Sequence, residues 1–394
     1  MVEPGIVIIG ASHAGVTLAG TLRQKKASAP ITLIGAEAVL PYHRPPLSKK
    51  LLTGEMTPQA IGLRAPNFYT DHAINLQLGT RVIAIDRTQQ RLTLCDGETL
   101  SYGALVLATG ARARPLPVSG RDLDGVHTLR TLADAQGLGS QLVPGARLVI
   151  VGAGYIGLEV AACARQLGTD VTVVERANAP LARVASPVVA EWARARHESR
   201  GVRFRFDANV VQLDGGPDGV EGVQLDDGSV LPADIVLVGI GAEPDTDLAA
   251  AAALELDNGV AVDDSLRSSD PNIYAIGDIS SFPCKFSGQR RRLESIQNAQ
   301  EQARALATTL AGEQAAPYRA LPWFWSDQGP DKLQSAGTSH PSAEWRLEGN
   351  PHANQFTVRH VLRDRLIATE SVNDPKTHMK TRREIEALPA EMAI

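Results

Sequence analysis

Short, unbroken apolar runs that end in glycine turns are the dominant pattern along this chain. In the first instance, an apolar run at residues 6–9 leads into a glycine turn at residues 10–15, a helical pattern and a second apolar run at residues 31–34. The same order recurs with apolar runs at residues 147–151 and 171–174. Such runs are typical of strands buried on both faces of a parallel sheet. Two strand–helix–strand units predict two nucleotide-binding domains.

The rest of the chain predicts how these units are organised. Apolar runs near residues 105–107 and 273–276 extend the first unit, and the composition changes near residue 317, where two tryptophans and alternating strands begin. We therefore predict an α/β fold with two Rossmann-like nucleotide-binding domains and a C-terminal α+β domain. The predicted limits are residues 1–113 plus 244–313 for the interrupted first domain, 114–243 for the second and 314–394 for the third.

Composition and charge narrow the class of protein. The 394 residues are 43% apolar and 21% charged, which is ordinary for a globular chain and excludes an intrinsically disordered one. A net charge of −5 argues against a nucleic-acid binder. The cysteines, Cys95, Cys163 and Cys284, lie far apart in the sequence. This spacing excludes a disulfide scaffold, a zinc ribbon, a C-x-x-C redox pair and a four-thiolate iron–sulfur site, and we expect no metal site.

The chain carries no pattern typical of a membrane segment. No apolar run reaches the roughly 20 residues that a membrane span needs. The apolar stretch at residues 5–22 is preceded by Glu3 and followed by Arg23, the reverse of the charge order in a signal peptide. We therefore expect a cytoplasmic protein.

The turn at residues 152–157 matches the dinucleotide fingerprint. Gly152, Gly154 and Gly157 allow a tight turn, close approach of a pyrophosphate and close packing of helix on strand. Glu175 follows at an offset typical of the acid that receives ribose hydroxyls, which favours NADH over NADPH. The neighbouring Arg176 argues in the other direction. Without its strand, helix and acid, such a turn would equally suit helix packing alone.

The first turn departs from this pattern because Ser12 stands where the middle glycine is usual. Serine is small and its hydroxyl can donate to a phosphate, so we expect nucleotide binding between Gly10 and Gly15, with Glu37 as the acid. The alternative is a packing turn without a ligand. A strand that stops at Gly277 and Asp278 supports a flavin, and the helix starting near Ser295 would direct its positive end at it. Alone, this Gly-Asp pair would be read as a surface turn.

Several strings in the chain carry a resemblance to a known family. They lie at residues 41–49, 105–110, 151–159, 273–278 and 322–328. Arg-Pro-Pro-Leu-Ser-Lys within the first and Trp-Phe-Trp-Ser-Asp-Gln within the last are the most specific. With these strings the chain resembles the FAD-containing, glutathione-reductase-like NADH:ferredoxin reductases of bacterial oxygenase systems, of the putidaredoxin-reductase and biphenyl-dioxygenase-reductase type.

The resemblance implies FAD on the first domain, NADH on the second and a C-terminal domain that covers the flavin. It implies that Arg44 contacts the adenine end, that Lys49 lies near the flavin N5 edge with Glu159 beside it, and that Asp278 holds the ribityl chain. Trp325, and less directly Trp323, would border the isoalloxazine. The lysine and acid would otherwise form an ordinary ion pair, and the tryptophans a small core. The family's usual acid after Gly35 is replaced by Ala36, so that either Glu37 substitutes or the FAD ribose is held less well.

The full set of expected site residues follows from these motifs and the resemblance. The expected catalytic residues are Lys49, Glu159 and Trp325. The expected FAD-binding residues are Gly10, Ser12, Gly15, Glu37, Arg44, Lys49, Val82, Ala108, Thr109, Gly110, Arg130, Gly277, Asp278, Ser295, Ile296 and Trp325. The expected NAD-binding residues are Gly152, Gly154, Tyr155, Ile156, Gly157, Glu175, Arg176, Arg183 and Gly241.

The expected reaction is electron transfer from NADH to a separate iron–sulfur protein. NADH would deliver a hydride to the flavin N5, and the electrons would leave singly to a [2Fe-2S] ferredoxin that feeds an oxygenase. A basic triplet, Arg290, Arg291 and Arg292, with Lys285 near it, is a candidate docking patch for an acidic ferredoxin. The alternative for this triplet is a solvated loop. The sequence does not indicate an oligomeric state.

Three other functions share this fold. A disulfide or peroxide reductase would need a cysteine within residues 41–52, and none is present. A redox-responsive flavoprotein of the apoptosis-inducing-factor kind would share the Arg-Pro-Pro-Leu-Ser-Lys string but would oxidise NADH slowly. A simple NADH oxidase would consume oxygen without a protein partner.

Overall fold

The first sheet of the computed structural model, which describes residues 4–388, is built from strands far apart in the sequence. Five parallel strands lie in the order β19-β7-β1-β2-β3. Their bounds are Ile6–Ile9 for β1, Ile31–Gly35 for β2, Ile74–Leu78 for β3, Ala104–Leu107 for β7 and Ile273–Ala275 for β19. The pairing of β19 with β7 returns the chain to the first sheet after the second unit, as the predicted interruption requires.

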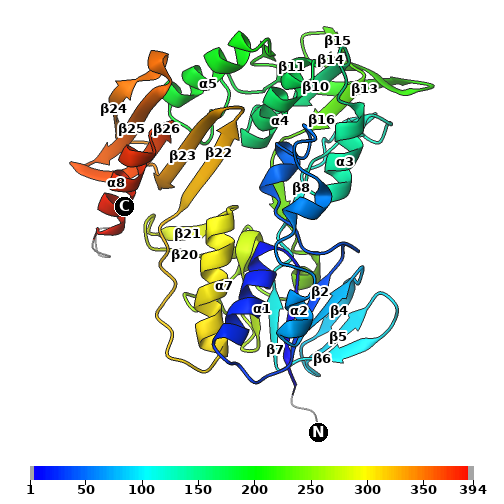
Figure 1. Cartoon of the computed structure of the whole chain (residues 1–394), viewed down its shortest axis with the longest axis vertical. Helices are drawn as coiled ribbons and strands as arrows, with labels where there is room; N and C mark the ends of the chain where they lie inside the picture. The colour runs from blue at the N-terminus through cyan, green and yellow to red at the C-terminus, as the bar shows by residue number, and fades with distance from the viewer. Residues whose placement is uncertain (1–3, 389–394) are drawn as a thin grey trace.

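Helices α1 (His13–Gln24) and α7 (Ile296–Leu310) pack side by side against this sheet (Figure 1). Ser295 caps α7 by accepting a hydrogen bond from the backbone of Asn298, so the helix begins where the sequence predicts it. Smaller elements complete this part of the molecule. They are α2 (Phe68–Asp71), β4 (Val82–Asp86), β5 (Arg91–Leu94), β6 (Thr99–Ser101), α6 (Asp247–Ala251), β18 (Val260–Ala261), β20 (Ser280–Cys284) and β21 (Gln289–Arg292).

The second sheet is also parallel and carries the second glycine turn. Its strands lie in the order β12-β11-β10-β16-β9, which confirms two Rossmann-like units in an α/β fold. Its elements are β9 (Val126–His127), α3 (Leu132–Gln141), β10 (Arg147–Val151), α4 (Tyr155–Gln166), β11 (Asp170–Val174), α5 (Pro187–Ser199), β12 (Arg203–Arg205) and β16 (Ile235–Val238). An antiparallel sheet of β13 (Val210–Gly216), β14 (Gly219–Leu225) and β15 (Val230–Pro232) is attached to it.

The two crossovers between these units pair with each other. Strand β8 (Ala111–Ala113) runs antiparallel to β17 (Ala242–Pro244), with Ala113 opposite Ala242 and Ala111 opposite Pro244. The chain thus leaves and re-enters the first unit as a two-stranded ribbon. The domain limits drawn at these crossovers stay predictions.

The C-terminal part is an antiparallel sheet covered by one helix, and it lies at one end of the molecule (Figure 1). The strand order is β22-β23-β26-β25-β24. The bounds are Trp323–Gln328 for β22, Asp331–Gly337 for β23, Glu344–Asn350 for β24, Gln355–Leu362 for β25, Arg365–Val372 for β26 and Pro375–Glu386 for α8. The predicted α+β arrangement is therefore confirmed.

One apolar cluster joins the segment after β2 to the second parallel sheet and the C-terminal sheet, and it fixes the position of the site. It contains Leu47 from the 3-10 turn Pro45–Ser48, Leu158 from α4 and Leu333 from β23. These residues bring the turn that follows the first nucleotide-binding unit, the helix of the second and the C-terminal sheet to one place. Among residues 4–388, no helix is both long enough and apolar enough to cross a bilayer.

Candidate functional site: two glycine turns and a buried ion pair

The first glycine turn, between β1 and α1, needs its glycines for packing. Gly10 has φ = 120°, and a Cβ there would lie 2.1 Å from the carbonyl oxygen of Ala108. A Cβ at Gly15 would lie 2.1 Å from the carbonyl oxygen of Gly10. Ser12 is the N-cap of α1, but its side chain makes no capping hydrogen bond. The hydroxyl is therefore available at a helix N-terminus, where phosphates bind.

This turn opens onto a cavity of about 410 Å³ at the carboxyl ends of the parallel strands. A ligand binds at this edge in open α/β sheets. The predicted FAD-binding residues in its lining are Gly10, Ser12, Glu37, Arg44, Val82, Ala108 and Thr109. Apolar walls with a few polar groups suit an adenosine, and the backbone N–H groups at the start of α1 suit its pyrophosphate, so the residues present fit FAD.

Glu37 is fixed at the wall of this cavity. Its Oε1 is 2.7 Å from Nη2 of Arg44, and its Oε2 accepts a hydrogen bond of 2.6 Å from the hydroxyl of Tyr42. Burial raises the pKa of Tyr42, which therefore stays a donor at neutral pH. Arg44 also donates to the carbonyl oxygen of Arg130 at 2.5 Å. These contacts hold a carboxylate group at position 37, although Ala36 lacks one.

A histidine pair that the sequence interpretation missed lies beside the same turn. His13 is buried at the first turn of α1, and its Nε2 is 3.4 Å from Nδ1 of His43. Burial, followed by the charges of His43, Arg44 and Arg130, lowers the pKa of His13 to about 3. The guanidinium groups of Arg44 and Arg130 suit a bound pyrophosphate. The only sequence signal was a histidine inside the glycine turn.

The predicted flavin residues Gly110, Arg130 and Asp278 come together from three segments. Nη2 of Arg130 is 2.8 Å from Oδ2 of Asp278, and a Cβ at Gly110 would lie 3.4 Å from the same nitrogen. Burial alone would lower the pKa of Arg130, but the charge and hydrogen bond of Asp278 raise it above its ordinary value. Gly277 donates its backbone N–H to Oε1 of Gln302 at 2.7 Å, which attaches the turn after β19 to α7.

The second glycine turn leaves one glycine open to solvent. A Cβ at Gly152 would lie 2.5 Å from the carbonyl oxygen of Gly239, and one at Gly157 would lie 2.4 Å from that of Gly152. A Cβ at Gly154 would meet nothing within 4 Å, and the same holds for Gly241. This is the open cradle that a pyrophosphate needs between two packing glycines. Ile156, at the start of α4, is 46% exposed beside it.

Glu175 closes the other side of this cradle. Its Oε2 accepts from the backbone N–H of Ala153 at 2.8 Å, and its Oε1 accepts from that of Ala177 at 2.9 Å. The carboxylate is therefore held at the end of β11, where a ribose is expected. Arg176 and Arg183 are exposed and make no hydrogen bond or ion pair within the described residues.

A buried ion pair lies where the turn Pro45–Ser48, helix α4 and strand β22 meet. Nζ of Lys49 is 2.8 Å from Oε2 of Glu159, and the two side chains are 17% and 5% exposed. Glu159 lies on α4, while Lys49 follows the 3-10 turn Pro45–Ser48. On β22, Trp325 lies next to Ser326, whose Oγ donates to Glu159. The rings of Trp323 and Trp325 have centroids 5.5 Å apart, and Tyr155 packs on Phe324 at 4.7 Å.

The basic triplet on β21 is only partly available to a partner. The side chain of Arg292 is 9% exposed, contacts Glu294 at 2.7 Å and donates to the carbonyl oxygen of Asp278 at 3.1 Å. Arg290 donates to the carbonyl oxygens of Val262 and Ser281. Two of the three guanidinium groups therefore hold the protein together. A solvated loop is not what forms here, because the triplet is a strand of a hairpin.

Comparison with known proteins finds matches over nearly the whole chain. Residues 4–303 match the pyridine nucleotide-disulphide oxidoreductase family, and residues 323–390 match the reductase C-terminal family. Rhodocoxin reductase of Rhodococcus erythropolis is 44% identical, over 96% of this chain and 88% of that protein. Rubredoxin-NAD(+) reductase of Pseudomonas putida is 42% identical, over 94% and 96%. The crystal structure of a covalent putidaredoxin reductase–putidaredoxin complex matches with a TM-score of 0.95 at 38% identity, over 99% of this chain and 94% of that one.

Proposed function

The chain belongs to the pyridine nucleotide-disulphide oxidoreductase family, and we propose that it is an NADH-dependent FAD enzyme that reduces a small iron–sulfur protein. The observation that carries this proposal is the buried pair of Lys49 and Glu159, whose members come from segments next to the two nucleotide cradles. Lys49 follows the 3-10 turn that begins after Arg44 in the wall of the first cavity, and Glu159 lies on the helix that begins at the second glycine turn. One cradle opens onto the cavity beside β1, and the other lies at the start of α4. Two nucleotides that approach one charged pair suit hydride transfer between them, a reaction that depends on alignment.

The chain's own residues would bind and orient the two cofactors. The FAD supplies the redox chemistry, because it accepts a hydride and can release electrons one at a time. Ser12 and the N-terminus of α1 would hold its pyrophosphate, Glu37 its ribose and Asp278 its ribityl chain. Lys49 would donate to the flavin edge, and Trp325 would pack against the ring. Glu159 would keep Lys49 in place.

Glu175 favours NADH as the electron donor. Both carboxylate oxygens accept backbone N–H bonds, which fixes a negative charge where the ribose hydroxyls of the adenosine would lie. A 2′-phosphate at this position would be repelled. Arg176 is exposed next to it but makes no ion pair with the carboxylate among the described residues.

The partner we propose is a [2Fe-2S] ferredoxin. The relatives include a putidaredoxin reductase in complex with putidaredoxin, and also a reductase named for rubredoxin. The electrons must leave through the flavin, because no cysteine lies within residues 41–52. A partner with an iron–sulfur centre on a separate chain accepts such electrons one at a time.

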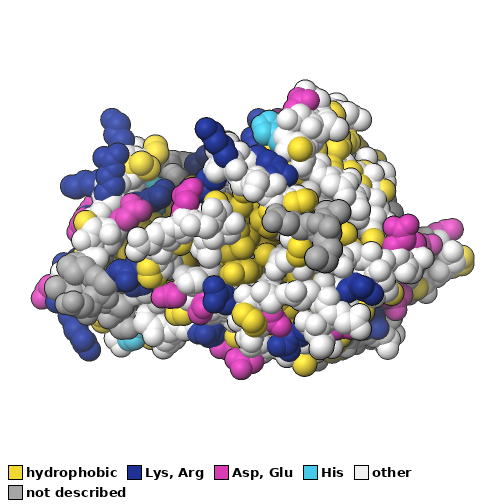
Figure 2. Space-filling view, turned by 90° about the horizontal axis from the view of Figure 1, so that it is seen from below, with side chains coloured by type: hydrophobic (Ala, Val, Ile, Leu, Met, Phe, Trp, Pro, Cys, Tyr) yellow, Lys and Arg dark blue, Asp and Glu magenta, His cyan; other side chains and the backbone are white. Residues whose placement is uncertain are grey.

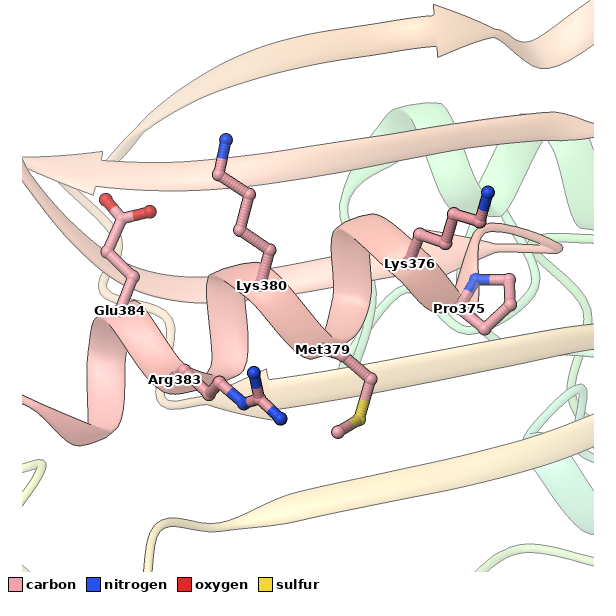
Figure 3. A pocket seen from close by; sticks show the side chains of 6 residues that line it. All are labelled: Pro375, Lys376, Met379, Lys380, Arg383 and Glu384. Carbon is pink, nitrogen blue, oxygen red and sulfur yellow. The ribbon is translucent and has the colours of Figure 1, made fainter.

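The docking surface we propose combines the β20–β21 hairpin with the exposed face of α8. A shallow, open hollow of about 810 Å³ lies along α8, and the side chains that line it all come from this helix (Figure 3). They are Pro375, Lys376, Met379, Lys380, Arg383 and Glu384. Lys and Arg side chains also gather at this end of the molecule in Figure 2. An acidic partner would be steered to such a surface in a salt-sensitive way.

Contacts between α8 and its neighbours put this surface close to the proposed flavin site. The guanidinium of Arg382, on α8, lies 4.8 Å from the ring centroid of Trp323. Phe286, in the β20–β21 hairpin, packs in the cluster that includes Ile385 of α8. A partner bound here would therefore lie next to the tryptophan pair of β22. Arg291 and Lys285 would contribute from the hairpin more readily than Arg292, whose side chain is buried.

The experiment that tests the function uses the purified flavoprotein under anaerobic conditions. NADH should bleach the flavin absorbance at about 450 nm. A ferredoxin should then support rapid reduction of cytochrome c. A rubredoxin and oxygen serve as competing acceptors in parallel assays. Failure of NADH to bleach the flavin contradicts the proposal. Fast oxygen consumption without a partner would indicate an NADH oxidase, and slow turnover with every acceptor would indicate a redox-responsive binding protein.

A further inference from the structure

We infer that a chain of buried hydrogen bonds, starting in the second nucleotide-binding unit, positions the carboxylate of Glu159. The hydrogen-bonded residues are His197 on α5, Gln328 on β22 and Ser326 on the same strand. The inference rests on the proposed function, in which Glu159 holds Lys49 at the flavin edge. It assigns a role to Ser326 and Gln328, which close the Trp-Phe-Trp-Ser-Asp-Gln string of residues 323–328.

The three residues form an unbroken path inside the protein. Nε2 of His197 is 2.9 Å from Oε1 of Gln328, and Nε2 of Gln328 donates to Oγ of Ser326 at 2.7 Å. Oγ of Ser326 donates to Oε1 of Glu159 at 2.5 Å. His197 and Ser326 are fully buried, and Gln328 is 1% exposed. Water therefore does not compete for these bonds.

The chemistry of these groups gives the path a single direction. The amide oxygen of Gln328 can only accept, so His197 must carry a proton on Nε2. The amide nitrogen of Gln328 can only donate, so the hydroxyl of Ser326 accepts from it and gives its own proton to the carboxylate. Burial lowers the pKa of His197 to about 4, which keeps this histidine neutral at pH 7. Each donor in the path points toward Glu159.

The opposite carboxylate oxygen is held by the first unit. Oε2 of Glu159 accepts from the hydroxyl of Ser48 at 2.5 Å and lies 2.8 Å from Nζ of Lys49. The two oxygens thus bind different parts of the molecule, Oε1 the C-terminal strand β22 and Oε2 the turn Pro45–Ser48. Hydrogen bonds to an ionised group are stronger than neutral ones. Oε1 also accepts from the backbone N–H of Asp327 at 3.3 Å, so Ser326 supplies the shorter of two hydrogen bonds from β22. Without Ser326 the carboxylate would be held less firmly in the orientation that pairs with Lys49.

The path also fixes the strand that carries the tryptophans. Side chains alternate across β22, so Ser326 and Gln328 point inward while Trp323 and Trp325 lie on the other face. The bonds from Ser326 to Glu159 and from Gln328 to His197 attach this strand to α4 and α5. Ser326, Gln328 and His197 are positioning residues, since they act on the reaction only through Glu159 and the strand.

A double-mutant cycle on the flavoprotein tests this inference. The variants are Ser326→Ala, Glu159→Gln and their combination, with Ser335→Ala on the adjacent strand β23 as the matched control. Rapid mixing with NADH gives the limiting rate of flavin bleaching and the dissociation constant of NADH. Urea unfolding of the wild type and these four variants, followed by circular dichroism, gives a readout that does not depend on activity.

We expect Ser326→Ala to slow flavin bleaching about tenfold, because one charge-assisted hydrogen bond is lost, and to leave the NADH dissociation constant within about twofold. In the Glu159→Gln background the same change should alter the rate by less than about twofold. Ser326→Ala should likewise shift the urea midpoint less in the Glu159→Gln background than in the wild type. Ser335→Ala should change neither the bleaching rate nor the urea midpoint.

An equal loss of rate in both backgrounds, or no loss from Ser326→Ala alone, overturns the inference. If Ser326→Ala does not yield a folded flavoprotein, Gln328→Met, which removes the next donor without a change in side-chain length, replaces it in the cycle. A wild-type protein that NADH does not reduce would contradict the proposed function instead. The urea cycle would then still decide whether Ser326 acts on Glu159.

Discussion

The thiol of Cys163 lies 3.4 Å from the backbone carbonyl oxygen of Ser48, to which it donates. Cys163 follows Glu159 by one helical turn on α4, so a thiol lies beside the proposed flavin site although residues 41–52 contain none. Burial, with the charge of Glu159 as the next cause, raises the pKa of Cys163 to about 12. The thiol therefore stays protonated at neutral pH and is a poor nucleophile.

Replacement of this cysteine should accordingly spare the reaction. We expect Cys163→Ala to retain NADH-dependent partner reduction within about twofold, at a cost of about 1–2 kcal/mol in unfolding free energy for the lost buried sulfur. The measurement is steady-state turnover together with urea unfolding. Iodoacetamide at pH 7 should label the exposed Cys95 and leave Cys163 unmodified. Loss of turnover with full flavin content would mean that the thiol takes part in electron transfer.

The wall of the first cavity predicts how FAD is retained. Glu37→Ala removes the acceptor for both Arg44 and Tyr42 and leaves a cation unpaired in the cavity. We expect FAD to bind about tenfold more weakly, because a hydrogen-bonded charge pair is broken and the ribose acceptor is lost. Fluorescence titration of apoprotein with FAD measures this. Exposed Glu313, which pairs with Lys25 on the surface, provides the control Glu313→Ala. Unchanged FAD affinity in Glu37→Ala would show that another group binds the ribose.

The end of β11 predicts coenzyme preference. Glu175→Ala removes the negative charge and frees the backbone N–H groups of Ala153 and Ala177, which can then donate to a 2′-phosphate. We expect the ratio of kcat/KM for NADPH over NADH to rise at least about tenfold. Glu191→Ala, an exposed acid on α5, should leave this ratio unchanged. If the ratio does not move in Glu175→Ala, coenzyme preference is set elsewhere.

The basic face of α8 predicts a salt-sensitive encounter with the partner. Lys376 and Lys380 are exposed one turn apart, and we expect their combined reversal to glutamate to lower kcat/KM for ferredoxin about tenfold at low salt. The difference from wild type should shrink as salt is added. Ferricyanide reduction should be unaffected, because a small acceptor needs no docking surface. Lys26→Glu, at the end of α1, is the matched reversal away from α8. Equal losses with ferredoxin and ferricyanide would contradict docking at α8.

Local signals explain the part of the fold that sequence reasoning predicted. The glycine turns, the buried strands beside them and the helix that begins at Ser295 are each specified by a few neighbouring residues. These signals predict the two parallel sheets and the α+β character of the C-terminal part. The pairing of β8 with β17 was not predicted, because it joins segments that are separate in the sequence.

The site was predicted less completely because its contacts are long-range. The hydrogen bond between Ser326 and Glu159 spans 167 positions, and no pattern in the sequence indicates it. His13 and His43 were missed for the same reason. The docking prediction for the basic triplet of β21 rests on charge alone. In the hairpin, side chains alternate between the two faces, and the side chain of Arg292 points into the protein.

Buried neutral histidines predict loss of stability in acid. Burial lowers the pKa of His197 and of His378 to about 4, below the value of about 6.5 in an unfolded chain. Between these pH values the unfolded state binds more protons, so each histidine makes the unfolding free energy fall by up to about 1.4 kcal/mol per pH unit as pH decreases. Urea unfolding at about pH 7, 6 and 5 measures how steeply the unfolding free energy changes with pH. His378→Asn should flatten it, whereas exposed His352→Asn should not. A slope that is the same in His378→Asn as in the wild type would show that other groups cause the acid sensitivity.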